Sequence, residues 1–257
     1  MRIRGRSKSL SMVALALVVI GLALAGYVAL DRSTDGEPAP APRPVGQVTV
    51  LFLHGGAWVA GTSGEFEPLA SKYRALGYNA ISIEYRDGNN NILHLIDNVQ
   101  AQVSKYKPLG PVVLYGSSAG GTLAAGVAAT GKVDGAVVIG APTDLVSVST
   151  NPYLGNAAKK ILDALGMTRK ELREASPISR LGRRPAKQLL HYGDRDLLVP
   201  LEQGTTYARA ARKRQPETRI EILRGIGHSG ALVYTPRYAD RALAWIRRHW
   251  PPPAVRR

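Results

Sequence analysis

The chain has 257 residues and contains no cysteine, which excludes disulfides, cysteine-ligated zinc and thiolate catalysis. Hydrophobic residues make up 45% of the sequence and charged residues 21%, a balance typical of a globular domain with a sizeable core. The formal net charge is +15, but no basic run is interleaved with aromatic residues, so the charge does not predict nucleic-acid binding. It indicates a solvated basic surface or attraction to an anionic membrane.

An uncharged apolar run near the N-terminus is long enough to cross a membrane. Residues 10–30 contain no charged side chain, and 21 residues of helix match a hydrocarbon core of roughly 30 Å. Four basic residues precede the run and Asp31 follows it, so the positive-inside rule predicts a cytoplasmic N-terminus and an extracytoplasmic remainder. The small residues Ala23 and Ala25 also fit a signal-peptidase site. The run is therefore either a membrane anchor or a cleaved signal peptide, and cleavage would give a secreted protein.

These features divide the chain into three regions. Residues 1–30 are the signal anchor or signal peptide, and residues 31–44 are a proline-rich, semi-extended linker. Residues 45–257 are predicted to form one folded domain. Within it, residues 151–181 are polar and partly helical, and we expect a small lid-like insertion there.

Beyond the linker, apolar strand-like runs alternate with helical stretches. Strands are predicted over Gln47–Leu53, Asn79–Glu84, Pro111–Tyr115, Gly135–Ile139, Gln188–Tyr192 and Arg219–Leu223. Helices are predicted over Glu67–Leu76, Ile92–Lys105, Thr122–Thr130, Thr205–Arg214 and Arg237–His249. Strands separated by helices imply right-handed crossovers. The predicted fold class is therefore α/β, with a doubly wound, mostly parallel six-stranded sheet covered on both faces.

A glycine-rich sequence follows the third predicted strand. Gly116-Ser117-Ser118-Ala119-Gly120 is a G-x-S-x-G motif, with an apolar strand before it and an alanine-rich helix after it. This context presents a serine hydroxyl on a sharp strand-to-helix turn, where glycines make room for the helix. We therefore predict Ser118 as a nucleophile. A packing turn without a catalytic role is the alternative that the motif alone leaves open.

A second glycine pair follows the first predicted strand, in His54-Gly55-Gly56-Ala57-Trp58. The reacting groups of a parallel sheet gather at the carboxyl ends of its strands, so this loop is expected beside the nucleophile. Its glycines let backbone N–H groups approach a substrate oxygen. The predicted oxyanion-hole donors are the N–H groups of Gly56, Ala57 and Ala119.

The general base is expected in the loop after the last strand. His228 lies there, in Gly225-Ile226-Gly227-His228, and the glycines let the loop fold back over the nucleophile. His54 follows a strand as well, but we expect it to fix the glycine loop by hydrogen bonds. The other histidines, which lie inside predicted elements or near the C-terminus, are His94, His191 and His249. His228 is the predicted base.

Two aspartates after the fifth strand compete for the role of the acid that orients the base. Asp196 precedes an apolar turn that could shield it, whereas Asp194 is expected to be a turn residue that pairs with Arg195. A triad acid must accept the imidazole N–H and hold its tautomer, which favours the shielded Asp196. Asp144, one strand earlier, is a third candidate.

Taken together, these pieces resemble the α/β-hydrolase family. The nearest branch is that of small carboxylesterases akin to hormone-sensitive-lipase-like, kynurenine-formamidase-like and feruloyl-esterase-like proteins. The matching pieces are HGGAW (54–58), EYR (84–86), GSSAGG (116–121), ASPIS (175–179), GDRDLLVP (193–200) and GIGH (225–228). The resemblance implies a cofactor-free esterase or amidase that works through an acyl-enzyme, and its D-x-x-V-P pattern supports Asp196. Such proteins usually have two strands before the HGG strand; only the linker precedes it here, so we expect a shorter sheet.

The predicted activity is hydrolysis of a small-molecule carboxylic ester by Ser118, Asp196 and His228, with no cofactor, no metal and no nucleic-acid partner. Trp58 anchors its loop or contacts substrate, and Ser117 is a further candidate for substrate contact. An amidase, thioesterase or lipase of the same fold is the alternative, as is a non-catalytic binding protein. The basic composition of the predicted lid argues against long-chain lipid substrates. We expect the domain outside the cytoplasm, held to the membrane by the N-terminal helix or released by cleavage.

Overall fold

Six strands form one parallel sheet in the computed structural model. They are β1 (Thr49–Leu53), β2 (Asn79–Ile83), β3 (Val112–Ser117), β4 (Gly135–Ile139), β5 (Lys187–Gly193) and β6 (Arg219–Leu223). Their order across the sheet is β2-β1-β3-β4-β5-β6, and every neighbouring pair is parallel. The chain thus runs from β1 to one edge and returns through β3 to the other, which is the predicted doubly wound arrangement.

The structure describes residues 46–150, 157–228 and 236–253. The predicted anchor or signal peptide and the proline-rich linker lie outside these ranges, as do the first six residues of the predicted lid. No helix within the described ranges is long and apolar enough to cross a membrane.

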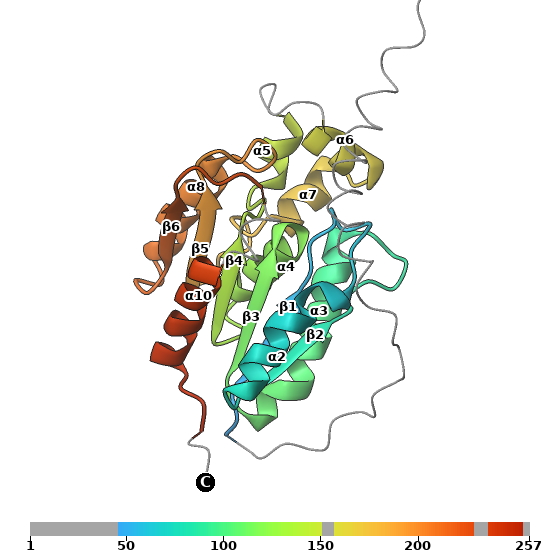
Figure 1. Ribbon diagram of the computed structural model, residues 1–257. Helices are drawn as coiled ribbons and strands as arrows, with labels where there is room; N and C mark the ends of the chain where they lie inside the picture. Colours follow the sequence, from blue (N-terminus) through green and yellow to red (C-terminus); the bar gives the residue numbers. More distant parts are fainter. Residues whose placement is uncertain (1–45, 151–156, 229–235, 254–257) are drawn as a thin grey trace, which may run out of the picture. The chain divides into compact units, whose positions relative to one another are not determined.

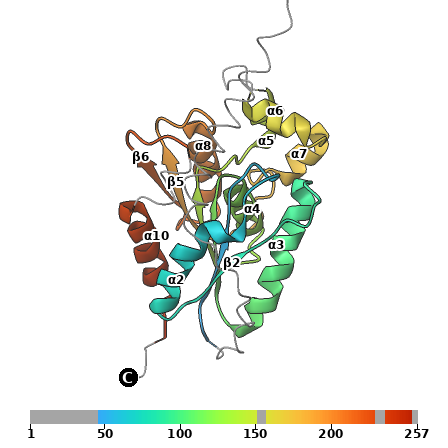
Figure 2. The ribbon, with the colours of Figure 1, turned by 45° about the vertical axis from the view of Figure 1, so that its right-hand side comes forward.

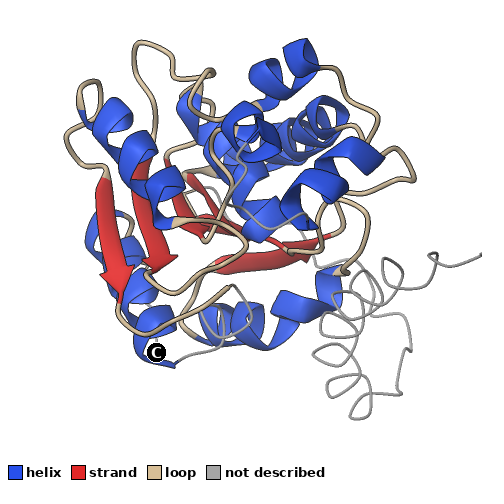
Figure 3. Cartoon of the chain, turned by 90° about the horizontal axis from the view of Figure 1, so that it is seen from above, coloured by secondary structure: helices blue, strands red, loops and turns tan. Residues whose placement is uncertain are grey.

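Helices cover both faces of the sheet (Figure 1; Figure 3). On one face lie α2 (Glu67–Ala75) and α10 (Pro236–His249); on the other lie α3 (Ile92–Tyr106), α4 (Ser118–Ala129) and α8 (Leu201–Arg212). Two short 3-10 turns precede α2 and follow α3, at Ser63–Phe66 and Lys107–Leu109. Successive residues of a strand point to opposite faces, so Val50 and Phe52 pack with α2 and α10 while Leu51 and Leu53 pack with α3 and α4. The sheet is therefore buried on both sides.

Three short helices lie beyond the carboxyl ends of the strands, between β4 and β5 in the sequence. They are α5 (Leu145–Thr150), α6 (Ala157–Ala164) and α7 (Arg169–Ala175), and they lie together at one end of the sheet (Figure 1; Figure 2). The described part of the predicted lid-like insertion is thus α6, α7 and the segment that follows them.

The helix after the G-x-S-x-G motif begins earlier than the sequence predicts, at Ser118 rather than at Thr122. Glycines disfavour helices, so the pattern placed Gly120 and Gly121 in a loop. They occur in the first helical turn because α4 packs closely on the sheet. A Cβ at Gly120 would lie 2.3 Å from the backbone oxygens of Leu53 and His54. Close packing therefore outweighs helix propensity here.

Candidate active site

Ser118 occupies a strained turn between β3 and α4. Its φ of 50° is in the left-handed region, which costs a non-glycine residue about 1–3 kcal/mol. The surrounding glycines make the turn possible, because a Cβ at Gly116 would lie 2.3 Å from the carbonyl oxygen of Gly120. The motif therefore has a steric function: it brings the strand and the helix close enough to project the Ser118 side chain above the sheet.

The three residues predicted as a triad lie in one chain of hydrogen bonds. The Ser118 Oγ lies 3.0 Å from Nε2 of His228, and Nδ1 of His228 lies 2.7 Å from Oδ2 of Asp196. The Asp196 side chain is fully buried, and that of His228 is 20% exposed. With its Nδ1 proton donated to the carboxylate, the imidazole presents Nε2 as an acceptor to the serine hydroxyl.

Asp196 is held by more than His228. Its second oxygen, Oδ1, accepts the backbone N–H groups of Leu198 at 2.9 Å and Val199 at 2.8 Å. A buried carboxylate needs such donors, since an unpaired charge in the interior is costly. The apolar turn after Asp196 thus supplies donors to the carboxylate as well as shielding it.

The two other candidate aspartates have different partners. Asp194 accepts the N–H of Gly225 at 2.7 Å and contacts Arg224 at 3.4 Å. It therefore joins β5 to the loop that carries His228, and it pairs with Arg224 where the sequence analysis expected Arg195. Asp144 accepts the N–H of Ser147 at the start of α5. Of these three aspartates, Asp196 is the one in contact with His228.

His54 fixes the glycine loop through two partners that the sequence analysis did not anticipate. Its Nε2 lies 3.1 Å from Glu84, and its ring stacks on Tyr85 with centroids 4.3 Å apart. The Tyr85 hydroxyl donates to the His54 carbonyl at 2.9 Å. Burial, followed by the nearby Glu84, raises the pKa of Tyr85 well above its usual value, so the phenol stays protonated and can donate. The EYR sequence follows β2, beside β1, which explains why it contacts the loop after β1.

The glycine loop turns through three consecutive residues with positive φ, which are Gly56, Ala57 and Trp58. Gly56 closes the turn: its carbonyl accepts the N–H groups of Val59 and Ala60, and a Cβ on it would lie 2.1 Å from the Ala60 oxygen. Of the predicted oxyanion donors, Ala57 and Ala119 line the same pocket as Ser118, whereas Gly56 is outside the pocket lining. Ala119 follows Ser118 in the first turn of α4, where backbone N–H groups lack helical partners.

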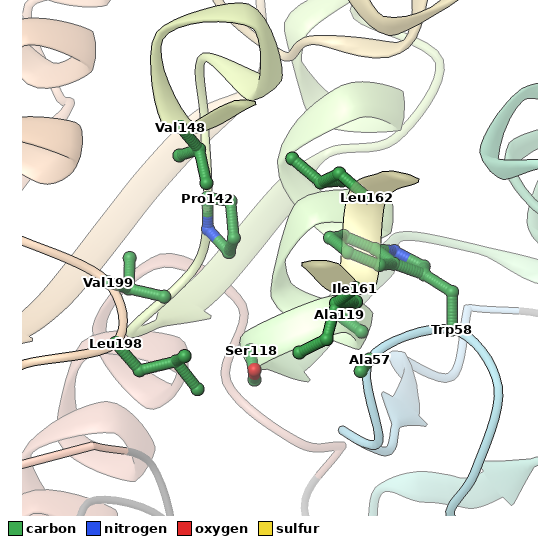
Figure 4. A pocket seen from close by; sticks show the side chains of 10 residues that line it. All are labelled: Ala57, Trp58, Ser118, Ala119, Pro142, Val148, Ile161, Leu162, Leu198 and Val199. Carbon is green, nitrogen blue, oxygen red and sulfur yellow. The ribbon is translucent and has the colours of Figure 1, made fainter. Parts of the chain in front are cut away.

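A small apolar pocket adjoins Ser118 (Figure 4). Its cavity measures about 30 Å³. The lining residues are Ala57, Trp58, Ser118, Ala119, Pro142, Val148, Ile161, Leu162, Leu198 and Val199. The pocket is therefore closed mainly by aliphatic side chains and one indole.

Trp58 and Ser117, the predicted substrate contacts, differ in position. Trp58 is 4% exposed and lines the pocket, and its indole Nε1 is buried without a hydrogen-bond partner in the described part of the chain. Ser117 is buried at the end of β3, outside the pocket lining. The lid contributes two lining residues that its basic composition concealed, Ile161 and Leu162 of α6.

No group of three or more His, Asp or Glu side chains in the described ranges is arranged to hold a metal ion. The polar groups beside the Ser118 hydroxyl are the His228 imidazole, which the Asp196 carboxylate contacts, and the nearby backbone N–H groups.

Comparison with known families assigns the fold and the general activity. The model of the BD-FAE family matches residues 39–210, about two thirds of the chain. The chain belongs to the BD-FAE family. This membership makes it an esterase of the α/β-hydrolase fold, as the motifs predict. The BD-FAE match includes Ser118 and Asp196 and ends before His228.

Solved structures give the same fold, while no curated protein sequence matches the chain. Thermogutta terrifontis esterase 2 phosphonylated by sarin has a TM-score of 0.69 at 17% identity, over 88% of this chain and 90% of that one. The native form of that enzyme has a TM-score of 0.67 at 19% identity, over 88% of each chain. Its butyrate-bound form has a TM-score of 0.67 at 18% identity, over 88% and 90%. At these identities the likeness shows that the BD-FAE chain has the α/β-hydrolase fold.

Proposed function

We propose that this chain hydrolyses esters of short carboxylic acids through an acyl-enzyme on Ser118. The observation that carries the proposal is the continuous hydrogen-bonded chain from Ser118 through His228 to the buried Asp196. Hydrogen-bond reach between nucleophile and base, with a third group that orients the base, is what nucleophilic catalysis by serine requires.

In the first half of the reaction, His228 Nε2 takes the Ser118 proton while Oγ bonds to the ester carbonyl carbon. The carbonyl π electrons move onto oxygen, and the Asp196 carboxylate stabilises the imidazolium without taking its proton. The tetrahedral intermediate then collapses, the bond to the alkoxy group breaks, and His228 donates its proton to the leaving alcohol. Water repeats the sequence on the acyl-enzyme, releasing the acid and restoring the Ser118 hydroxyl.

The oxyanion of each tetrahedral intermediate is assigned to the N–H groups of Ala57 and Ala119, with Gly56 as a third donor. Ala57 and Ala119 share the pocket with Ser118, and the strained loop holds Ala57 in place before substrate binds. Donors held in advance stabilise developing charge without reorganisation, and each is worth roughly 10²–10³ in rate.

The size of the pocket supports a short acyl group. A cavity of about 30 Å³ holds two or three water molecules at roughly 10–15 Å³ each, which matches an acetyl or propionyl chain. The family name covers feruloyl and acetyl esterases, and a cavity this small favours the acetyl esters. A small cavity also favours an esterase over a lipase that takes long acyl chains. The Thermogutta enzyme was also solved with propionate and with butyrate.

The cellular location that we propose follows from the sequence. The apolar run over residues 10–30 and the basic residues before it support a domain outside the cytoplasm, tethered to the membrane by an N-terminal helix. The linker over residues 31–44 would separate the domain from the bilayer. Cleavage after Ala25 would release the same domain in secreted form.

The residue assignment is tested by labelling the full-length chain with a fluorophosphonate probe. We expect the probe to label the wild type. Labelling should be lost in Ser118→Ala and retained in Ser117→Ala, the matched control on the neighbouring serine. Activity of Ser118→Ala toward nitrophenyl acetate should fall by about 10⁵–10⁶. Labelling that survives in Ser118→Ala would assign the nucleophile elsewhere.

The acyl specificity is tested with nitrophenyl acetate, butyrate and octanoate, and with a feruloyl ester. We expect kcat/KM to be highest for acetate and to fall with chain length. Leu162→Ala removes part of the pocket wall, so it should raise kcat/KM for butyrate relative to acetate by about tenfold, since a few methylene groups in an apolar pocket are worth roughly 1–3 kcal/mol. Faster hydrolysis of octanoate than of acetate by the wild type would contradict the short-chain assignment.

A further inference from the structure

Basic side chains gather where the strands begin. We define the amino edge as the loops 107–111, 130–134, 181–186 and 213–218 together with the first residues of β5 and β6. Its basic residues are Lys107, Lys132, Arg183, Arg184, Lys187, Lys213, Arg214 and Arg219, and its acidic residues are Asp134 and Glu217. All of the basic residues except Lys187, which is half-buried, are exposed. This edge therefore presents an excess of positive charge to solvent.

Little of that charge is neutralised within the protein. Lys107 pairs with Asp134 at 2.6 Å, and Glu217 is in contact with His249. By contrast, five basic side chains of the amino edge have no ion pair and no side-chain hydrogen bond within the described ranges. They are Arg183, Arg184 and Lys213, together with Lys187 and Arg219, which lie near Glu217. The attraction of the first three for an external anion is not reduced by an internal partner.

The loops at the opposite edge of the sheet have no such basic excess. The carboxyl edge is formed by the loops 54–62, 84–91, 140–144, 194–200 and 224–228, which surround Ser118. Its acidic residues are Glu84, Asp87, Asp144, Asp194 and Asp196, and its basic residues are Arg86, Arg195 and Arg224. The lid helices beyond this edge and the segment after them add Lys159, Lys160, Arg169, Lys170, Arg173 and Arg180 against Asp163, Glu171 and Glu174. The carboxyl end as a whole is therefore close to neutral, and the amino edge carries the larger excess of basic residues.

The chain enters the domain at the positive end. The N–H of Gly46 donates to the carbonyl of Leu109 at 2.7 Å, and that of Thr49 donates to the carbonyl of Pro111 at 2.8 Å. The linker over residues 31–44 therefore joins the domain beside loop 107–111. Its 14 residues extend at most about 43 Å at roughly 3.1 Å per residue. A membrane that holds the apolar run is consequently within reach of the amino edge.

We propose that the amino edge docks on the anionic phospholipid headgroups of the membrane that holds the N-terminal run, with the Ser118 pocket facing away from the bilayer. This inference rests on the tether in the proposed function. The linker keeps the edge at a high effective concentration near the surface, and anionic headgroups attract basic residues within a Debye length. Substrate then reaches the pocket from the aqueous side, so the bilayer's own lipids are not the substrates.

The test uses the full-length chain in vesicles and takes advantage of the absence of native cysteine. Ser104→Cys places one thiol on an exposed site in the last turn of α3, near the amino edge, and Leu197→Cys places one at a position that is 89% exposed on the carboxyl edge. A membrane-impermeant dye is attached after reconstitution, and its quenching by a headgroup-labelled lipid is compared in phosphatidylcholine vesicles with and without phosphatidylglycerol.

We expect the dye at position 104 to be quenched in anionic vesicles at low salt, and released in neutral vesicles and in about 1 M salt, where the Debye length is near 3 Å. The dye at position 197 should remain unquenched. The triple variant R183E/R184E/K213E should shift the docking equilibrium by about 100-fold, at roughly fivefold per basic residue. The matched variant R169E/K170E/R173E on α7 has the same net charge and should leave quenching unchanged.

The possible outcomes separate this inference from the tether. Flotation with neutral vesicles reports the tether alone, and a chain that fails to float there would disprove the tether. Binding of that untethered chain to anionic vesicles would still show whether the amino edge binds anionic headgroups. The docking proposal would be overturned if quenching at position 104 were the same in neutral and anionic vesicles. It would also be overturned if the dye at position 197 were quenched as strongly as the dye at position 104. Binding of a single-stranded DNA oligonucleotide without binding of anionic vesicles would overturn it as well, because it would assign the charge to nucleic acid.

Discussion

The two edges of the sheet use different kinds of residue where the backbone takes a left-handed conformation. At the carboxyl edge, three non-glycine residues have positive φ, namely Ala57, Trp58 and Ser118. At the amino edge, the described residues with positive φ are Gly110 and Gly131, and those that precede β1 and β2 are also glycines, Gly46 and Gly77. A glycine adopts this conformation without strain, whereas another residue remains there only when the surrounding packing holds it. The strain in this domain is therefore concentrated beside the pocket.

The two edges also differ in where their charged side chains lie. At the carboxyl edge the Asp196 carboxylate is buried and its contacts are with His228, Leu198 and Val199. At the amino edge Arg183 and Arg184 are exposed to solvent. One edge uses its polar groups to fix internal geometry, and the other presents them to solvent. Disrupting either edge should therefore have separate consequences, the first for rate and the second for membrane docking.

The largest expected effect comes from the two aspartates of the carboxyl edge. Asp196→Asn replaces the acceptor for the His228 Nδ1 proton with an amide, so the imidazole loses the tautomer that the reaction needs. We expect kcat for nitrophenyl acetate to fall by about 10⁴. Asp194→Asn alters only the contact with Gly225 and Arg224, and we expect less than a tenfold loss. Equal losses in the two variants would mean that placement of the His228 loop, rather than orientation of the imidazole, limits the rate.

A smaller effect is expected from His191, in β5 between the two edges. Its side chain is fully buried, 3.6 Å from Glu221, and neither ring nitrogen has a hydrogen-bond partner in the described ranges. Burial lowers the pKa of His191 to about 4, against the opposing effect of Glu221. Between pH 6.5 and 4 the unfolded chain binds a proton here that the folded chain does not, so stability falls as the pH falls through this window. The loss is at most about 3 kcal/mol.

Urea unfolding of the full-length chain at pH 7 and pH 4.5 measures this loss. We expect His191→Leu to flatten the pH dependence in this window. The same pH slope in His191→Leu and in the wild type would show that another group titrates.

The sequence was sufficient to predict the residues that meet at the carboxyl edge, because parallel strands bring their ends together whatever their order. Ser118, Asp196 and His228 each follow a predicted strand, and the structure places them in contact. Their catalytic roles remain predictions. The strand positions were equally accessible, since six apolar runs alternate with helices.

The sequence pattern could not predict contacts that depend on which strands are neighbours in the sheet. Glu84 and Tyr85 contact His54 because β2 lies beside β1, and Asp194 contacts Arg224 because β6 lies beside β5. The pocket wall escaped prediction for a similar reason. The basic composition of α6 concealed that Ile161 faces the pocket, a fact set by tertiary packing rather than by local sequence.

The smallest effects come from exchanging glycine and alanine between the two edges, and they test the comparison directly. Gly131→Ala places a side chain at a φ of +76°, with its Cβ 2.3 Å from the backbone oxygen of Arg184. We expect a stability loss of about 2 kcal/mol with kcat unchanged. Ala57→Gly removes the left-handed strain beside the pocket, so stability should rise by up to about 1 kcal/mol.

The cost of Ala57→Gly should appear in catalysis. A glycine at position 57 makes the oxyanion loop more flexible, so the N–H must be ordered during each reaction, and kcat should fall severalfold while KM changes little. Urea unfolding measures the change in stability of Gly131→Ala and Ala57→Gly, and steady-state kinetics measure the change in kcat. If Ala57→Gly lost stability and kept its kcat, the backbone at Ala57 would be fixed by favourable packing, and strain beside the pocket would have no part in holding the oxyanion donors. A gain in stability paired with a loss of rate would show that the carboxyl edge retains strain because the strained loop positions those donors.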